Sequence, residues 1–291
     1  MDKNLVYRLF REDCYGGDPE DRWDNRPRLS RTALEPVQVQ MRFAFGKYMQ
    51  TLGYTDAWYF KNLAWCDICN SILPRTQSKA NQQNTARKGK KYWGSKAEQQ
   101  YSHNLRGSKR VLKMRNSDTV RVWFVPILAR GKLHIEVLPD DFPGDVEEGM
   151  AAFVARVRAG LNARFPDGGP KQLFTDRGNG FYGSGSGAMT DSYCAALKAN
   201  KLKAFMGTCA SMQPGCLQEV MLHETAMAWV RIRLAKTVPK NCWTESVADY
   251  HKRLKACCAD INATHNVDGL RRELPLRVQM LVDNKGDRIP K

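Results

Sequence analysis

Apolar and polar residues alternate most regularly between positions 120 and 138 of the chain. Apolar residues or proline occupy every second position from 120 to 128, and the alternation resumes from 133 to 137. Arg130 and Gly131 lie between the two runs. A period of two is typical of strands, and a short turn that contains glycine joins antiparallel neighbours. The segment therefore predicts a β-hairpin.

Longer stretches on either side of the hairpin show the spacing and the end signals of helices. They predict helices at residues 35–52, 145–163, 190–199, 216–236, 244–261 and 266–283. Short apolar runs predict buried strands at 62–67, 173–174 and 202–206. The order along the chain is strand, basic stretch, hairpin, helix, strand, helix, strand and helix. This order predicts an α/β fold in which helices flank a sheet.

The composition indicates a globular protein with a polyanionic partner. The chain has 291 residues, of which 42% are hydrophobic and 26% charged, enough to build a core. Its net charge of +16 favours nucleic acid as the partner. The chain has neither a long apolar run nor an apolar leader, so we expect no membrane insertion and no secretion. Nine cysteines without a regular spacing indicate reduced thiols in an intracellular compartment.

The positive charge is concentrated in residues 75–115, which contain twelve lysines or arginines and a single acid. Aromatic residues interrupt the basic run, and this arrangement suits phosphate contacts together with base stacking. The residues expected to contact nucleic acid are Arg87, Lys88, Lys90, Lys91 and Trp93. A solvated surface loop is the alternative interpretation. Residues 183–187 are rich in glycine and serine but lack the sequence of a phosphate loop, so we expect no small-molecule cofactor.

Three acidic residues occupy positions at which the predicted elements would bring them together. Asp67 and Asp176 each end a predicted strand, and neighbouring strands lie about 4.8 Å apart. Glu219 falls in the first turn of the helix predicted at 216–236, where a carboxylate interacts favourably with the helix dipole. Three carboxylates suit hard cations such as Mg²⁺, and two cations about 3.5–4 Å apart support phosphodiester chemistry. The alternative third acid is Glu224, about 7.5 Å further along the helix, and both glutamates can hardly serve one site.

These segments resemble the catalytic domain of the mariner-type transposase superfamily. Residues 62–67 are similar to the strand that carries the first Asp of the family, and residues 174–176 to the strand that carries the second. Residues 211–219 resemble the segment that leads to the third acid, and residues 274–286 resemble the C-terminal motif. Two differences stand out. Arg177-Gly178-Asn179 replaces the Asn-Ala-Pro of the family, and the 42 residues between Asp176 and Glu219 are more than the family has.

The resemblance implies a ribonuclease H-like mixed sheet flanked by helices over residues 35–291. Residues 75–115 would be a basic insertion between the first two strands, in the position of the family's clamp loop. The implied function is DNA strand cleavage and strand transfer by two Mg²⁺ or Mn²⁺ ions. Asp67, Asp176 and Glu219 would hold these ions, and Arg177 would contact a phosphate. A homodimer, and a nuclear location in a eukaryotic cell, are further implications.

Residues 1–34 are polar and predicted to be a flexible N-terminal segment. They are too short and too polar for the helix-turn-helix domains that precede the catalytic domain in the family. Two alternatives to an active transposase therefore stay open. One is a catalytically inactive, transposase-derived DNA-binding protein, and the other is a nuclease on the same fold.

Overall fold

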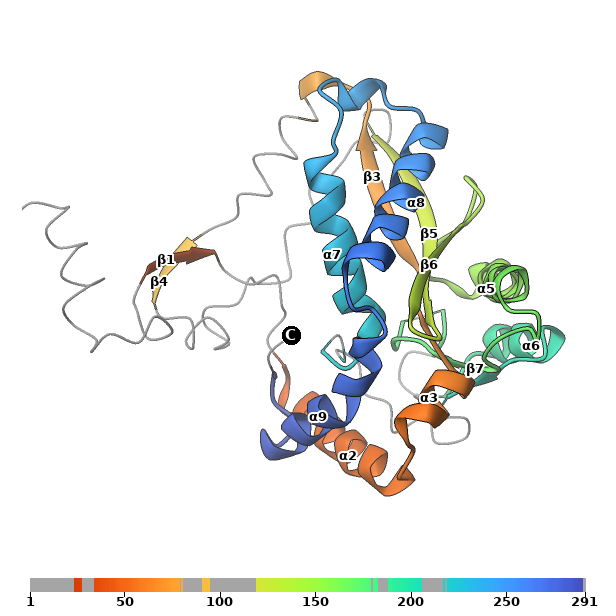
Figure 1. The fold of residues 1–291 in the computed structure, drawn as a ribbon, viewed down its shortest axis with the longest axis vertical. Helices are drawn as coiled ribbons and strands as arrows, with labels where there is room; N and C mark the ends of the chain where they lie inside the picture. The colour runs from red at the N-terminus through yellow and green to blue at the C-terminus, as the bar shows by residue number, and fades with distance from the viewer. Residues whose placement is uncertain are drawn as a thin grey trace, which may run out of the picture.

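A mixed sheet of six strands forms the centre of this computed structural model (Figure 1). The structure describes residues 24–27, 34–78, 80, 91–94, 119–178, 180–182, 188–205, 217 and 219–289. The strands follow the order β6-β5-β2-β7-β8, and β3 also pairs with β5. β7 runs parallel to β2 and β8, whereas β5 is antiparallel to β2, β3 and β6. The strands are β2 (Leu63–Cys66), β3 (Cys69–Pro74), β5 (Thr119–Ala129), β6 (Lys132–Val137), β7 (Gln172–Phe174) and β8 (Lys203–Ala204).

β2 and β3 form one line of residues along β5, with a gap between them. Their pairings with β5 follow one continuous register, in which the two intervening residues lie opposite Val125 and Pro126. These two residues, Asp67 and Ile68, take no part in the ladder. A proline has no N–H group to donate, which explains an interruption at this position. Asp67 therefore lies at a break in the sheet, between β2 and β3.

Helices cover both faces of the sheet, with α7 and α8 on one face and α5 and α6 on the other (Figure 1). The side chains of β2 alternate between these faces, because Leu63 and Trp65 belong to the core under α7 and Ala64 and Cys66 to the core under α5. None of the helices in the described part of the chain combines the length and the apolar character of a membrane span. The helices are α2 (Pro36–Leu52), α3 (Asp56–Asn62), α5 (Met150–Arg164), α6 (Asp191–Ala199), α7 (Leu222–Lys236), α8 (Val247–Thr264) and α9 (Gly269–Asp283), with 3₁₀ helices η5 (Glu147–Gly149) and η7 (Cys242–Thr244).

The hairpin and the six predicted helices are present, although the bounds of several differ. Arg130 and Gly131 form the hairpin turn with φ values of 47° and 74°, as two-residue turns require. α3 and β3 were not predicted, so the basic stretch follows β3 rather than the strand that leads to Asp67. The basic stretch itself contains β4 (Lys91–Gly94), which pairs with β1 (Asp24–Pro27) in a separate sheet. The helix predicted at 216–236 begins only at Leu222.

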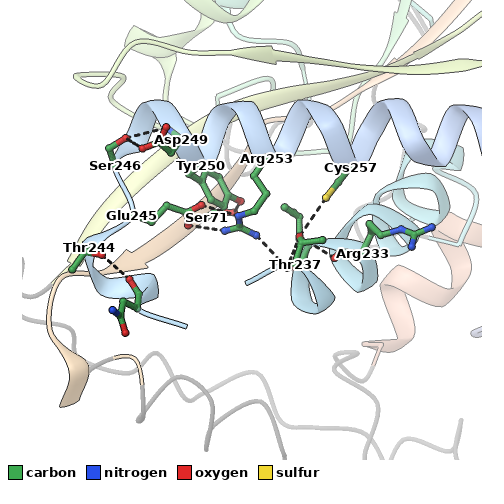
Figure 2. A network of polar contacts seen from close by, with 12 residues as sticks. Ser71, Arg233, Thr237, Thr244, Glu245, Ser246, Asp249, Tyr250, Arg253 and Cys257 are labelled. Carbon is green, nitrogen blue, oxygen red and sulfur yellow. Dashed lines mark hydrogen bonds and ion pairs between the residues drawn. The ribbon is translucent and has the colours of Figure 1, made fainter. Parts of the chain in front are cut away.

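Polar contacts join the start of α8 to the end of α7 and to β3 (Figure 2). The Arg253 guanidinium donates two hydrogen bonds of 2.7 Å to the Glu245 carboxylate and one of 3.1 Å to the Leu234 carbonyl. The guanidinium also lies over the ring of Tyr250, whose hydroxyl group donates to Ser71 in β3. Bidentate pairs of this kind have a defined geometry. The network therefore fixes α7 and α8 with respect to the sheet.

Candidate active site

Asp67 and Asp176 follow two neighbouring parallel strands. β2 pairs with β7 in a register that joins Trp65 to Phe174, and each aspartate lies two residues beyond this pair. Because adjacent strands lie about 4.8 Å apart, the two aspartates start from neighbouring positions at one edge of the sheet. The structure thus places side by side the two strand-end acids that the sequence singled out.

The two aspartates also belong to the same face of the sheet. Trp65 and Phe174 are both part of the core cluster beneath α7. Side chains of a strand return to the same face after two residues, so Asp67 and Asp176 continue on this face. The residue directly before each aspartate belongs to the opposite face of the sheet. On that face Cys66 lies in the core under α5. Both carboxylates are therefore directed to the layer that contains α7.

The first turn of α7 adds two further polar groups. Its first residue is Leu222, and the acid in its first turn is Glu224. One ligand atom each from Asp67, His223 and Glu224 lies within 4.8 Å of the other two. Glu224 also approaches Arg231, about two helical turns further along α7, at 3.5 Å. A strand end and a helix start thus converge on one small region.

Burial and repulsion by nearby carboxylates raise the pKa of both aspartates above the ordinary value. For Asp67 the largest cause is burial, followed by the charges of Asp176 and Glu224. For Asp176 burial is again the largest cause, and a hydrogen bond from the Arg177 N–H group opposes it. Each aspartate accepts one such bond of 2.7 Å, from the N–H group of Ile68 or of Arg177.

A divalent cation would fit this group of carboxylates. Among the residues that the structure describes, no lysine or arginine forms an ion pair with Asp67 or Asp176. Within the described part of the chain, these two half-buried carboxylates therefore have no ion-pair partner, and burial together with nearby acidic groups raises their pKa values. Carboxylate oxygens are the ligands that Mg²⁺ prefers, and they also suit Mn²⁺.

A fourth carboxylate, that of Asp145, lies near the group and was not predicted. It accepts a hydrogen bond of 3.2 Å from the Gly180 N–H group, and its charge helps to raise the pKa of Asp67 and Asp176. A Cβ atom at Gly178 would collide with the Asp145 carboxylate. The two glycines after Asp176 therefore let this loop approach Asp145 closely, and they were the signal in the sequence that a close approach was needed.

Glu219 lies in a different environment, a buried cluster of ion pairs. Its carboxylate is 3.1 Å from Arg42 and 2.9 Å from Arg288, and its side chain is fully buried. Arg277 donates a hydrogen bond of 2.7 Å to its backbone carbonyl group. Burial raises the pKa of Glu219, but the two guanidinium groups outweigh burial and hold the pKa below the ordinary value. A carboxylate that is already neutralised by two cations is a poor ligand for a metal ion.

The start of α7 corrects one argument from the sequence. That argument placed Glu219 in the first turn of a helix, whereas Glu219 lies in the turn before α7. There the Val220 N–H group donates to the Leu217 carbonyl group at 2.8 Å. The first-turn argument applies instead to Glu224, the alternative third acid, which the structure places beside Asp67.

Three of the six predicted nucleic-acid contacts lie outside the described residues. Lys91 and Trp93 belong to β4, where the backbone pairs with β1. Arg177 is half-buried, directly after Asp176, and its N–H group binds the Asp176 carboxylate. The residues outside the described part are Arg87, Lys88 and Lys90.

Comparisons with known proteins connect this geometry to a fold. Scanned against protein-family models and curated proteins, the sequence matches none. The catalytic domain of the Mos1 mariner transposase matches in structure, with a TM-score of 0.55 and 9% identity over 89% of this chain and 99% of its own. The Mos1 paired-end complex with Mn gives a TM-score of 0.58 and 10% identity, over 100% of this chain and 72% of that chain. The strand transfer complex gives 0.56 and 9%, over 99% and 71%. The predicted ribonuclease H-like fold is thereby confirmed: this chain has the fold of the mariner transposase catalytic domain.

Proposed function

We propose that this chain is a transposase-like enzyme that cleaves DNA strands and transfers them in a metal-dependent reaction. The observation that carries the proposal is the neighbouring position of Asp67 and Asp176 at one edge of a ribonuclease H-like sheet, with Glu224 within 4.8 Å of Asp67. Two of these acids come from strand ends and the third from a helix start. Sites that are built on such regular elements hold their ligands more precisely than sites on loops.

The three carboxylates are proposed to hold two Mg²⁺ or Mn²⁺ ions. When bound, such a pair of cations activates an attacking hydroxyl group and stabilises the leaving oxygen in phosphodiester chemistry. The part played by the chain is to orient the ligands: the N–H groups of Ile68 and Arg177 each fix one oxygen of an aspartate. The N-terminus of α7 adds the positive end of a helix dipole, which favours a phosphate group of the substrate.

DNA is the proposed substrate. The net charge of +16 supports a polyanion, and the basic stretch 75–115 carries much of that charge. Arg177 adjoins the carboxylates and is suited to contact the phosphate under attack. The similar Mos1 structures are titled as paired-end and strand transfer complexes. By analogy we propose DNA ends as the substrate, a homodimer as the working form and, in a eukaryotic cell, action in the nucleus.

Nicking of supercoiled plasmid DNA tests the proposal. We expect the full chain to nick the plasmid with Mg²⁺ or Mn²⁺ and to be inactive with a chelator. Asp176→Asn should abolish nicking, while Asp283→Asn, a control at an exposed position at the end of α9, should leave it unchanged. Strand transfer is measured by joining an oligonucleotide with a free 3′-hydroxyl group to the plasmid.

The alternatives give different results in the same assays. Salt-dependent DNA binding without nicking would identify an inactive DNA-binding protein. Nicking without any joined product would identify a nuclease. Equal activity of Asp176→Asn and the wild type would refute the assignment of the site.

A further inference from the structure

His223 lies inside the group of carboxylates. The residue is 1% exposed. It is the second residue of α7 and directly precedes Glu224. One ring nitrogen of His223 lies within 4.8 Å of a carboxylate oxygen of Asp67 and of one of Glu224. Consecutive residues of a helix point about 100° apart, so two neighbours reach one site only where the helix end itself is directed at that site.

The three side chains of Asp67, His223 and Glu224 offer a metal ion different ligands from a group of carboxylates alone. Mg²⁺ is a hard cation that takes oxygen ligands and retains water, whereas imidazole nitrogen suits transition metals. Two carboxylate oxygens and one imidazole nitrogen within 4.8 Å form a mixed donor set. Such a set discriminates between Mn²⁺ and Mg²⁺, two ions that an all-oxygen site accepts more evenly.

We propose that His223 is a nitrogen ligand of one of the two metal ions and makes the site select Mn²⁺ over Mg²⁺. This inference rests on the proposed metal-dependent function and adds to it the identity of the preferred ion. Asp67 and Glu224 supply the oxygen ligands of the same ion. The buried position of the imidazole limits the exchange of this ligand for water.

Spectroscopy of bound Mn²⁺ gives a readout that is independent of catalysis. In electron spin-echo measurements on the full chain with Mn²⁺, we expect modulation from a coordinated imidazole nitrogen. The modulation should change when the histidines carry ¹⁵N, and it should disappear in His223→Gln. His251→Gln, which alters an imidazole in α8 outside this cluster, should leave the signal intact.

Titration calorimetry supplies the second measurement. Loss of even an outer-shell partner of a metal site lowers affinity about 10- to 100-fold, so His223→Gln should weaken Mn²⁺ binding by at least about tenfold. Mg²⁺ binding should change little, so the preference for Mn²⁺ should largely disappear.

The outcomes separate this inference from the proposed function. Suppose that the wild type binds Mn²⁺, and that Asp67→Asn abolishes binding, but that no nitrogen coupling is seen. The role of His223 is then refuted, and the metal site stands. The role of His223 also fails if His223→Gln retains the coupling or the Mn²⁺ preference. If the wild type binds neither ion, both proposals fail. The ¹⁵N experiment needs only wild-type protein, so an absence of nitrogen coupling there refutes the role of His223 even if the variants do not fold.

Discussion

Replacing each of two glutamates by glutamine should separate a structural acid from a metal-binding one. Glu219 lies between Arg42 and Arg288 in the interior, whereas Glu224 lies beside Asp67 and repels it. Glu219→Gln removes the negative charge that lies between these two buried guanidinium groups. Glu224→Gln removes a repelling charge and leaves the fold otherwise intact.

The magnitudes of the two effects differ. Breaking a buried ion pair by removing one partner lowers the free energy of unfolding by about 3–5 kcal/mol. With roughly 2.1 cal/mol/K of unfolding entropy per residue, the 291-residue chain would lose about 5–8 °C in Tm. The pairing of Glu224 with Arg231 involves a side chain that is 55% exposed, and exposed pairs contribute about 0–1 kcal/mol. Glu224→Gln should therefore change the metal-free Tm by only about 1–2 °C.

Thermal unfolding with a chelator, and then with Mn²⁺, measures both effects. A bound ion at 100 times its Kd stabilises the folded state by about 2.7 kcal/mol, or about 4 °C in this chain. We expect Glu219→Gln to have a lowered Tm but to retain the rise with Mn²⁺. Glu224→Gln should have a metal-free Tm close to the wild type and should lose the rise.

The opposite pattern would refute this reasoning. If Glu219→Gln unfolds at the wild-type temperature and no longer responds to Mn²⁺, the buried cluster contributes little to stability. Glu219 would then be the metal-binding acid, as the sequence first indicated. The nicking assay on both variants provides an independent comparison.

Two further predictions concern pH and a glycine. Folding raises the pKa of Asp67 above 3.8, so the stability that this carboxyl group contributes is present below that pH and lost as the pH rises through its folded-state value. In denaturant titrations without metal, the difference in unfolding free energy between the wild type and Asp67→Asn should follow this course, and a pH-independent difference would contradict it. Gly286→Ala should destabilise the protein by several kcal/mol more than Gly53→Ala. Both glycines have positive φ, but only at Gly286 would a Cβ atom collide with a backbone carbonyl of α2, while nothing lies within 4 Å at Gly53. Similar unfolding free energies for the two variants would refute that account.

Patterns in the sequence were sufficient to predict the hairpin and to place Asp67 and Asp176 at strand ends. The alternation that starts at Val120 indicated a strand, and Asp67 and Asp176 each lay within two residues of the end of an apolar run. α3 was missed because its aromatic residues resemble a strand and its seven residues span only two turns. β3 was missed because it is polar at several positions and is held mainly by its pairing with β5.

Local sequence patterns do not decide which of Glu219 and Glu224 lies beside Asp67. The start of α7 depends on where the chain before it is fixed. That segment is fixed by pairing of Glu219 with Arg42, 177 positions away, and with Arg288, 69 positions away. Local propensity carries no information about partners at such distances. The approach of Asp145 depends in the same way on a loop contact that only the glycines after Asp176 hinted at.

The distant partners of Glu219 also have a consequence for the timing of biosynthesis. A ribosome adds about 5–20 residues per second, so the 69 positions from Glu219 to Arg288 correspond to roughly 3–14 s. During this interval the growing chain contains Arg42 and Glu219 but not the second cation. The contact between Arg42 and the Gly286 carbonyl group joins residues 244 positions apart, which corresponds to roughly 12–49 s. The segment that leads into α7 can therefore be completed only after residue 288 has been synthesised, and a stop codon just before position 288 would remove its second cation.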